Sequence, residues 1–341
     1  MFQVFASTPE DMGPGEIGAH AARAEAMGFA GLQVPDAIHD GLLLAAMALS
    51  TTTSLIVGTA VLVAFPRSPM ITAIAAWDLQ AMSGGRFELG LGTQIKPNIE
   101  KRYSARWDSP VPQLREYVQA LKAIFRSFQT GERLDFEGEH YTLTKLQPFF
   151  NPGPIEHPGI PVLCGAVGPA MTKMVGRIAD GMITHPTNSP PRYIREVCLP
   201  RLQSGFAQAK RNPEDFKLVI GPLTATGKNE AEVAVAREKQ RSLLGFLYST
   251  PAYWPSLELF GWEDKGQQLL DMTRRGSWDE MPQIITDDML DQFVPSGDYS
   301  QIAEVFRARY ARLTRRVTFP MPENPADDAL AAVVIRQLQS E

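Results

Sequence analysis

Residues 55–92 read LIVGTAVLVAFPRSPMITAIAAWDLQAMSGGRFELGLG, and this stretch decides the fold class. Its first nine residues are continuously apolar or small, which is typical of a strand that is buried on both faces. Ser68 and Pro69 then supply an N-cap and a first helical residue, and residues 83–85 end the helix. Residues 86–92 form the next strand. The stretch therefore predicts a strand–helix–strand unit, in which a crossover helix joins two parallel strands.

The helix of this unit has an apolar face. Its members are spaced at i, i+3, i+4, i+8 and i+11, the pattern of a helix that packs on a core. They are Ile71, Ile74, Ala75, Leu79 and Met82.

The same alternation of strand and helix continues along the chain. Short apolar runs predict the strands, at 2–5, 31–34, 55–63, 86–92, 162–164, 181–184, 216–220 and 316–319. Segments with helical periodicity lie between them. Eight strands that alternate with helices indicate an α/β protein with a closed (β/α)8 TIM barrel rather than an open sheet.

The chain is longer than a plain barrel requires. Since such a barrel needs about 250 residues, roughly 90 remain for insertions, which we place after the fourth and seventh strands. The first contains a hairpin predicted at 134–143, and the second contains an irregular, aromatic-rich segment at 248–295. These aromatic residues form either a lid over the site or a packing and dimer contact. No linker separates two parts, so we expect residues 1–341 to form a single domain.

Composition excludes several classes of protein. The net charge of −5 argues against a nucleic-acid partner, which needs a basic face. No apolar run reaches the length of a membrane span, and the first residues do not resemble a secretion signal. The two cysteines, Cys164 and Cys198, are too few for a disulfide framework or a tetrahedral zinc site. We expect a cytoplasmic protein without a membrane partner and without a metal site.

Three segments have residues suited to ligand binding. Residues 58–60 are small, so they either admit a flat ligand or simply pack tightly. Thr93 and Gln94 follow the fourth strand, at the end of a barrel where active sites lie. Residues 164–170 pass from a strand through a glycine-containing turn into a helix. This turn is either a phosphate site at the helix N-terminus or an ordinary connection.

Together these segments resemble a known family. The runs at 57–93 and 162–185 are similar to the bacterial-luciferase-like superfamily, in particular to its branch that depends on the deazaflavin coenzyme F420. The hairpin segment FEGEHYTL and residues 289–310 also resemble members of that branch. The resemblance covers nearly the whole chain. It implies an oxidoreductase with F420, or alternatively FMN, in the mouth of the barrel.

The resemblance also implies site residues. A cis peptide between Ala60 and Val61 would form a bulge behind the central ring of the cofactor, next to Thr59. The remaining matches to cofactor-binding positions are Asp36, Thr93, Asn98, Gly165, Ala166, Gly168, Pro169, Thr184 and His185. Among these, the residues from Gly165 to Pro169 would hold the phosphate of the cofactor tail, and Asp180 and Gly181 would close that side together with Thr184 and His185.

The chain departs from the family at two positions. Ala37 and Ile95 stand where the deazaflavin-dependent sugar dehydrogenases have a histidine and a glutamate, so we do not expect that activity. His39 is the alternative proton carrier, although its position equally suits a solvated loop histidine.

These expectations define a function. The chain would transfer hydride between C5 of the deazaflavin and a small organic substrate, with the protein supplying position and a proton donor. The alternatives are an FMN-dependent luciferase-like monooxygenase and a flavin-binding barrel without catalysis. The resemblance further implies a homodimer.

Overall fold

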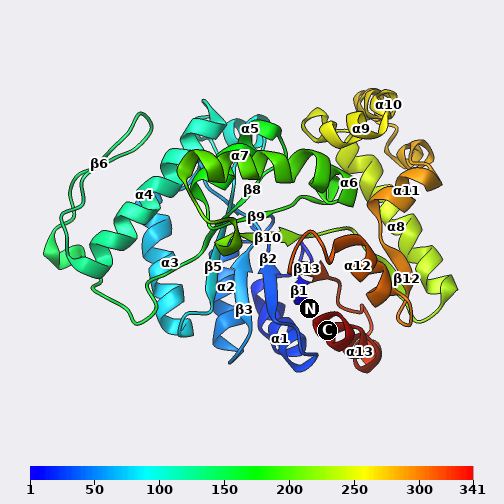
Figure 1. Cartoon of the computed structure of the whole chain (residues 1–341), viewed down its shortest axis with the longest axis horizontal. Coiled ribbons are helices and arrows are strands. Elements are labelled where there is room, and N and C mark those ends of the chain that lie inside the picture. The colour runs from blue at the N-terminus through cyan, green and yellow to red at the C-terminus, as the bar shows by residue number, and fades with distance from the viewer. Residues whose placement is uncertain (341) are drawn as a thin grey trace.

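The computed structural model describes residues 1–340 and contains a closed parallel barrel surrounded by helices (Figure 1). The strands are hydrogen-bonded in the order β3-β2-β1-β13-β10-β9-β8-β5, and pairing of β5 with β3 closes the ring. Their bounds are β1 Gln3–Ser7, β2 Gly31–Val34, β3 Ile56–Thr59, β4 Leu62–Val63, β5 Phe87–Gly92, β8 Val162–Gly165, β9 Gly181–Ile183, β10 Lys217–Ile220 and β13 Arg316–Phe319. Since β3 and β4 are consecutive halves of one barrel position, the predicted (β/α)8 barrel is confirmed.

Helices follow the strands and cover the outside of the barrel (Figure 1). Their bounds are α1 Pro14–Ala26, α2 Gly41–Ser50, α3 Pro69–Ser83, α4 Pro110–Thr130, α5 Pro169–Ile178, α6 Pro191–Tyr193, α7 Leu199–Ala209, α8 Glu230–Tyr248, α12 Ile302–Tyr310 and α13 Asp328–Gln339. The predicted ends of α3 are confirmed: the hydroxyl of Ser68 accepts a hydrogen bond from the amide of Ile71 at 3.2 Å, and Gly84 is left-handed with φ 62°.

The apolar face predicted for α3 is wrong in part: Leu79 is buried and Ala75 packs against the core, but the other three members are exposed. Ile71, Ile74 and Met82 are 61%, 44% and 54% exposed, whereas Trp77 on another face is buried. Trp77 stacks on Phe125 of α4 with ring centroids 5.7 Å apart. The buried face of α3 consists mostly of small and polar residues, whose suitability for burial depends on neighbouring elements. Apolar spacing alone therefore placed three exposed residues on the buried face of the helix.

The two longest connections follow β5 and β10. The first contains α4 and the hairpin of β6 Phe136–Glu137 and β7 Thr142–Leu143. The second begins with α8 and includes a short parallel pair, β11 Ala225–Gly227 and β12 Ser296–Asp298. The expectation of an irregular segment at 248–295 is wrong, because it contains three helices that pack on α8 around their own apolar cluster. These are α9 Pro255–Phe260, α10 Glu263–Arg275 and α11 Asp287–Phe293.

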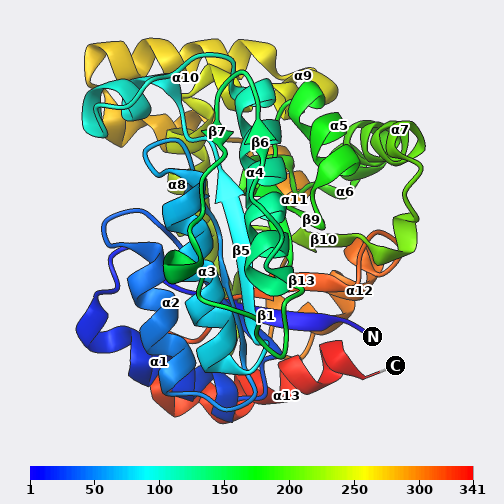
Figure 2. The same ribbon diagram turned by 90° about the vertical axis from the view of Figure 1, so that its left-hand side faces the viewer.

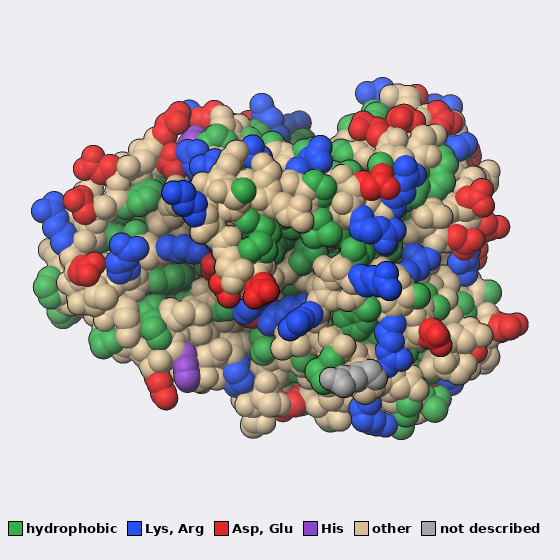
Figure 3. All heavy atoms as spheres, viewed as in Figure 1, with side chains coloured by type: hydrophobic (Ala, Val, Ile, Leu, Met, Phe, Trp, Pro, Cys, Tyr) green, Lys and Arg blue, Asp and Glu red, His purple; other side chains and the backbone are tan. Residues whose placement is uncertain are grey.

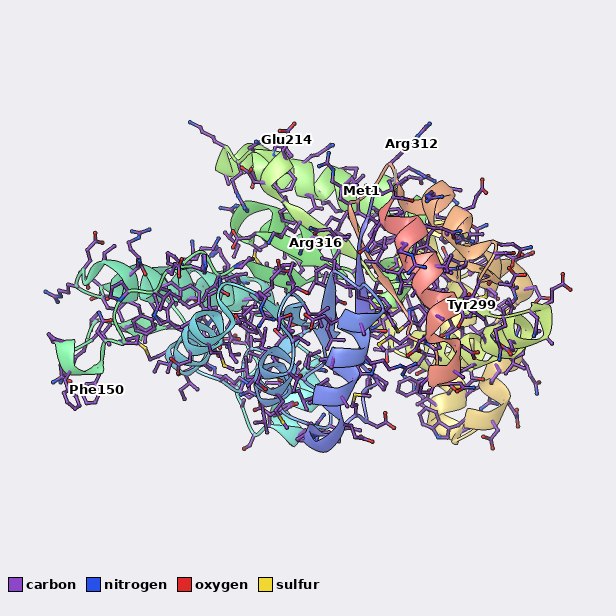
Figure 4. The ribbon with its side chains drawn as sticks, turned by 90° about the horizontal axis from the view of Figure 1, so that it is seen from below. Met1, Phe150, Glu214, Tyr299, Arg312 and Arg316 are labelled. Atoms are coloured by element: carbon purple, nitrogen blue, oxygen red, sulfur yellow. The ribbon has the colours of Figure 1, made fainter. Side chains whose placement is uncertain are left out.

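Charged side chains close the amino-terminal end of the barrel. The buried carboxylate of Glu88 accepts hydrogen bonds from Lys217 at 2.7 Å and from Arg316 at 2.8 Å. Arg316 also donates to the side chain of Gln3 at 2.7 Å, and Figure 4 shows it beside Met1. Each of these side chains projects from the beginning of a barrel strand. The opposite end, where the strands finish, is therefore the end available for a site.

The outside of the molecule is mixed in character. None of the helices within residues 1–340 combines the length and the apolar character needed to cross a membrane. Figure 3 shows acidic and basic side chains distributed over the same face of the molecule, around a central group of hydrophobic side chains.

In Figure 2 the arrow of β5 points toward the end of the molecule where α9 and α10 lie, so the second insertion is on the side of the barrel mouth.

Candidate functional site

The mouth of the barrel is shaped by an interruption between β3 and β4. The peptide between Ala60 and Val61 is cis, as predicted. On the preceding residue, the buried hydroxyl of Thr59 donates to the carbonyl of Gly90 at 2.8 Å and accepts from its amide at 2.9 Å. This side chain joins the interrupted strand to β5, so it is not free to bind a ligand directly.

Small residues surround the interruption. A Cβ on Gly92 would lie 2.4 Å from Val61, and one on Gly165 would lie 3.5 Å from it. Ala60 and Val61 themselves are half-buried, above the inward-facing side chains Leu163, Ile183 and Val219. The result is an apolar floor with little side-chain bulk at the mouth of the barrel. We call Ala60, Val61, Gly92 and Gly165 the small-residue floor.

Asp36 supports this floor from the side. One oxygen of its carboxylate accepts from the amide of Val63 at 2.9 Å, and the other accepts from the amide of Gly41 at 3.0 Å. Arg67 lies 3.4 Å from Asp36 and 2.9 Å from Asp40. Because both carboxylate oxygens of Asp36 are occupied, its evident role is to fix the backbone after the interruption.

The pKa of neighbouring Asp40 reflects the same ion pair. Burial would raise this pKa, but the hydrogen bond from Arg67 and those from the first amides of α2 outweigh burial and lower it. His39 lies between Asp36 and Asp40 in sequence, and its ring faces the start of α1, where a Cβ on Gly13 would lie 3.5 Å from Nε2. Its assignment as the proton carrier stays a prediction.

Hydrogen bonds within the loop after β5 hold it together, and one further hydrogen bond attaches it to the loop after β2. Thr93 donates to the carbonyl of Gln94 at 3.1 Å, and Asn98 donates to the side chain of Gln94 at 3.0 Å. Gln94 is left-handed with φ 58°, a conformation that is unfavourable for a residue with a side chain. Arg102 donates to the carbonyl of Ala37. Thr93 and Asn98 thus lie at the mouth, and both are hydrogen-bonded to Gln94, which the sequence placed there beside Thr93.

The turn between β8 and α5 leaves a helix N-terminus without a side-chain cap. Its N-cap residue is Gly168, and Pro169 is the first helical residue. The carbonyl of Ala166 accepts from Asn188 at 2.7 Å, and that of Val167 accepts from Tyr193 at 3.3 Å. The turn is therefore held through its carbonyl groups, while the amides at the start of α5 remain suited to an anion.

The loop after β9 contains a fixed, neutral histidine. Nδ1 of His185 accepts from the amide of Thr187 at 3.3 Å and lies 2.8 Å from its hydroxyl. Burial lowers the pKa of His185 to about 4. With Nδ1 as acceptor, the proton of the neutral ring is on Nε2, which makes that atom a donor. Thr184, by contrast, is occupied by Ser189 at 2.7 Å and by the amide of Gly221 at 3.0 Å.

Two residues at the mouth were missed or left undecided by sequence reasoning. Tyr253, from the second insertion, stacks on His185 with centroids 4.3 Å apart and planes 10° apart. Its place in a loop far along the chain gave no signal beyond its aromatic character. Thr8 follows β1, is 8% exposed, and has a buried hydroxyl without a hydrogen-bond partner within residues 1–340. An unpaired buried hydroxyl at this end of the barrel is a candidate ligand contact.

One expected part of the site is wrong. Asp180 and Gly181 lie at the beginning of β9, at the amino-terminal end of the barrel, and not beside the turn before α5. The carboxylate of Asp180 accepts from the amide of Val162 at 3.0 Å and from Lys122 at 2.8 Å. Asp180 therefore joins adjacent strands and α4, and it cannot close a site at the opposite end.

Comparisons with known proteins agree with this geometry. The model of the luciferase-like monooxygenase family matches residues 1–316. The chain is 42% identical, over 87% of each chain, to an uncharacterized protein of Mycobacterium tuberculosis. It is 28% identical to the F420-dependent glucose-6-phosphate dehydrogenase of Nakamurella multipartita, covering 96% of this chain and 92% of the relative.

A solved structure has the same fold. The coenzyme F420-dependent tetrahydromethanopterin reductase of Methanopyrus kandleri superposes with a TM-score of 0.81 at 20% identity, covering 99% of this chain and 98% of the reductase. At this identity the likeness concerns the fold. The match of the family model along almost the entire length is the stronger finding, and this chain belongs to the luciferase-like monooxygenase family of enzymes.

Proposed function

We propose that this protein is a coenzyme F420-dependent oxidoreductase that transfers hydride between C5 of the deazaflavin and a small organic substrate. The observation that carries the proposal is the small-residue floor beside the uncapped N-terminus of α5. A flat ring needs an apolar surface without projecting side chains, and an anionic tail needs unpaired amides. Relatives named as F420-dependent enzymes support the choice of cofactor.

The residues at the mouth fit such a cofactor. Ala60 and Val61 would back the ring, and the buried hydroxyl of Thr8 would gain a partner near its edge. The tail phosphate would lie on the turn from Gly165 to Pro169. Thr93 and Asn98 would border the ring from the loop after β5, while Asp36, Thr59 and Thr184 would act through the backbone that they hold.

The protein's own residues would handle the proton. The bound deazaflavin would supply the position that gives or accepts hydride. His185 would donate a hydrogen bond from Nε2 to the cofactor or to a substrate oxygen, since its pKa keeps it neutral at physiological pH. His39, a half-buried residue of the loop before α2, would exchange the proton with solvent. Tyr253 would cover one face of His185 and exclude water from it.

An FMN-dependent monooxygenase is the second candidate, favoured by the description of the family itself. A flavin-binding barrel without catalysis is the third. Equilibrium titration with F420 and with FMN, followed by fluorescence quenching, separates the first two. We expect F420 to bind with micromolar or tighter affinity and FMN to bind more weakly. Tight FMN binding with oxygen-dependent bleaching would select the monooxygenase, and F420 binding without any substrate-dependent bleaching would select the third candidate.

The exposed apolar face of α3 supports the homodimer implied by the family resemblance. Ile71, Ile74 and Met82 would be covered by a second copy of the chain. We also retain as proposals the single domain over residues 1–341 and the cytoplasmic location. A single, concentration-dependent unfolding transition is the result expected from one cooperative domain in a dimer.

A further inference from the structure

A hairpin outside the barrel mouth folds back on the long helix α4. β6 and β7 pair in antiparallel fashion, and Figures 1 and 2 show this hairpin beside α4. At its tip, the backbone amide of His140 donates to the carboxylate of Glu116 at 2.8 Å. The ring of Tyr141 meets that of Tyr117 edge-on with centroids 5.5 Å apart. The tip is thus fixed on α4 by both polar and aromatic contacts.

Three ligand-type side chains meet at this contact. One ligand atom from each of Glu116, Glu139 and His140 lies within 4.8 Å of the other two. Glu116 projects from α4 and is 6% exposed, whereas Glu139 is at the exposed tip of the hairpin. The nearest cation to Glu116 is Arg115, at 3.8 Å. Two carboxylates, one of them buried, are therefore close together with little positive charge to compensate them.

Two buried polar atoms at the same contact lack hydrogen bonds. Within residues 1–340, neither Nε2 of His140 nor Oε1 of Gln113 has a partner. Gln113 is 9% exposed and lies one helical turn before Glu116, and its amide nitrogen donates to the hydroxyl of Tyr141 at 3.2 Å. Buried polar groups without partners cost free energy, so they point to an unseen partner at the site.

We propose that Glu116, Glu139 and His140 bind a divalent transition-metal ion of the zinc type. An imidazole nitrogen with carboxylate oxygens is a usual ligand set for zinc. The two carboxylates balance the charge of the ion, and the exposed position of Glu139 gives it access from solvent. Ligands about 2.1 Å from one ion lie about 3.4 Å from each other, so small rotamer changes bring the three together. The ion would fix the tip of the hairpin to α4.

This site is separate from the proposed redox chemistry. It lies on the hairpin and α4, and none of its ligands belongs to the barrel mouth. It revises the expectation of no metal site, which was based on the two cysteines and did not consider a histidine and two glutamates brought together by folding. Failure of the redox proposal would leave this proposal unaffected.

Calorimetric titration of the metal-free full chain with ZnCl2, and in parallel with MgCl2, tests the site. We expect one zinc ion per chain, with affinity reduced at least about tenfold in both His140→Ala and Glu139→Gln. Both substitutions alter the hairpin and leave the buried Glu116 in place. His157→Ala is the matched control, because His157 is an exposed histidine outside the cluster, and we expect it to bind like the wild type.

Zinc should also slow amide hydrogen exchange at residues 136–143 in the wild type and not in His140→Ala. Magnesium, which prefers all-oxygen octahedral sites, should bind much more weakly. The proposal is overturned if the wild type fails to bind zinc at millimolar concentration, or if His140→Ala binds it as tightly as the wild type. Equal losses in His140→Ala and His157→Ala would also overturn it, since they would indicate nonspecific binding to surface histidines.

Discussion

The substitution Gly168→Asp tests the proposed anion site at the start of α5. Gly168 is the N-cap residue, and no atom lies within 4 Å of a Cβ built on it, so a side chain fits there. An aspartate at this position would accept hydrogen bonds from the first amides of the helix and would place a negative charge where we position the cofactor phosphate. At a separation of about 5 Å and an effective dielectric constant of about 20, the repulsion is about 3 kcal/mol.

Partial exposure of the turn reduces this repulsion by screening, so we expect a net loss of about 1.5–2 kcal/mol in F420 binding. This corresponds to an affinity about 10–30-fold lower. The assay is fluorescence titration of wild type, Gly168→Asp and Gly168→Asn. Asparagine can cap the helix in the same way but has no charge, so Gly168→Asn should lose much less affinity.

Stability and a shortened ligand provide the controls. Both variants should unfold at or slightly above the wild-type temperature, because an N-cap side chain stabilises a helix relative to glycine. A deazaflavin that lacks the phosphate-containing tail should bind wild type and Gly168→Asp equally well. If Gly168→Asp binds intact F420 as tightly as the wild type, the phosphate is not on these amides. Equal losses in the aspartate and asparagine variants would show that occupation of the amides, and not charge, is responsible.

Three further predictions concern stability, pH and assembly. Glu88→Gln should lower the free energy of unfolding by about 2–4 kcal/mol, because it leaves Arg316 and Lys217 without a counter-charge. Urea unfolding measures this loss, and a change below about 0.5 kcal/mol would contradict the prediction. Burial lowers the pKa of His185 from its ordinary value of about 6.5 to about 4, so the unfolded chain takes up the extra proton at a higher pH than the folded chain. Wild type should lose stability as pH falls from about 6.5 to 4, by up to about 3 kcal/mol, and His185→Gln should lack this component; identical pH slopes would refute the assignment. Ile74→Glu should shift a dimer toward monomer, measured as a lower mass in light scattering. Val235→Glu, at an exposed position on α8, is the control. Equal masses for the wild type and both variants would exclude the α3 face as the interface.

Local sequence patterns were sufficient to predict the strands of the barrel, but not which face of each surrounding helix is buried. The strands were predictable because continuous apolar runs alternate with capped helices, and each run is long enough to be recognised alone. The face of α3 was not predictable, because Trp77 is buried by Phe125 on a different helix. The helices at 255–293 were missed since their aromatic residues form a cluster with α8 whose members are distant in sequence.

The same limit applies to the site. Small residues before and after the interruption of β3 indicated the floor, and the glycine-containing turn indicated the uncapped helix. Sequence reasoning could not show that the side chains of Asp36 and Thr59 are hydrogen-bonded to backbone groups of neighbouring strands. Nor could it show that Asp180 lies at the opposite end of the barrel, since that depends on where β9 begins. Tyr253 reaches His185 only through the packing of the second insertion.

The most direct measurement is a crystal structure of the full chain grown with coenzyme F420. We expect a tricyclic ring lying on Ala60 and Val61, with the tail phosphate within hydrogen-bonding distance of amides between Gly165 and Ala170. Side chains that fill this opening, or density for the cofactor at any other place on the molecule, would contradict it.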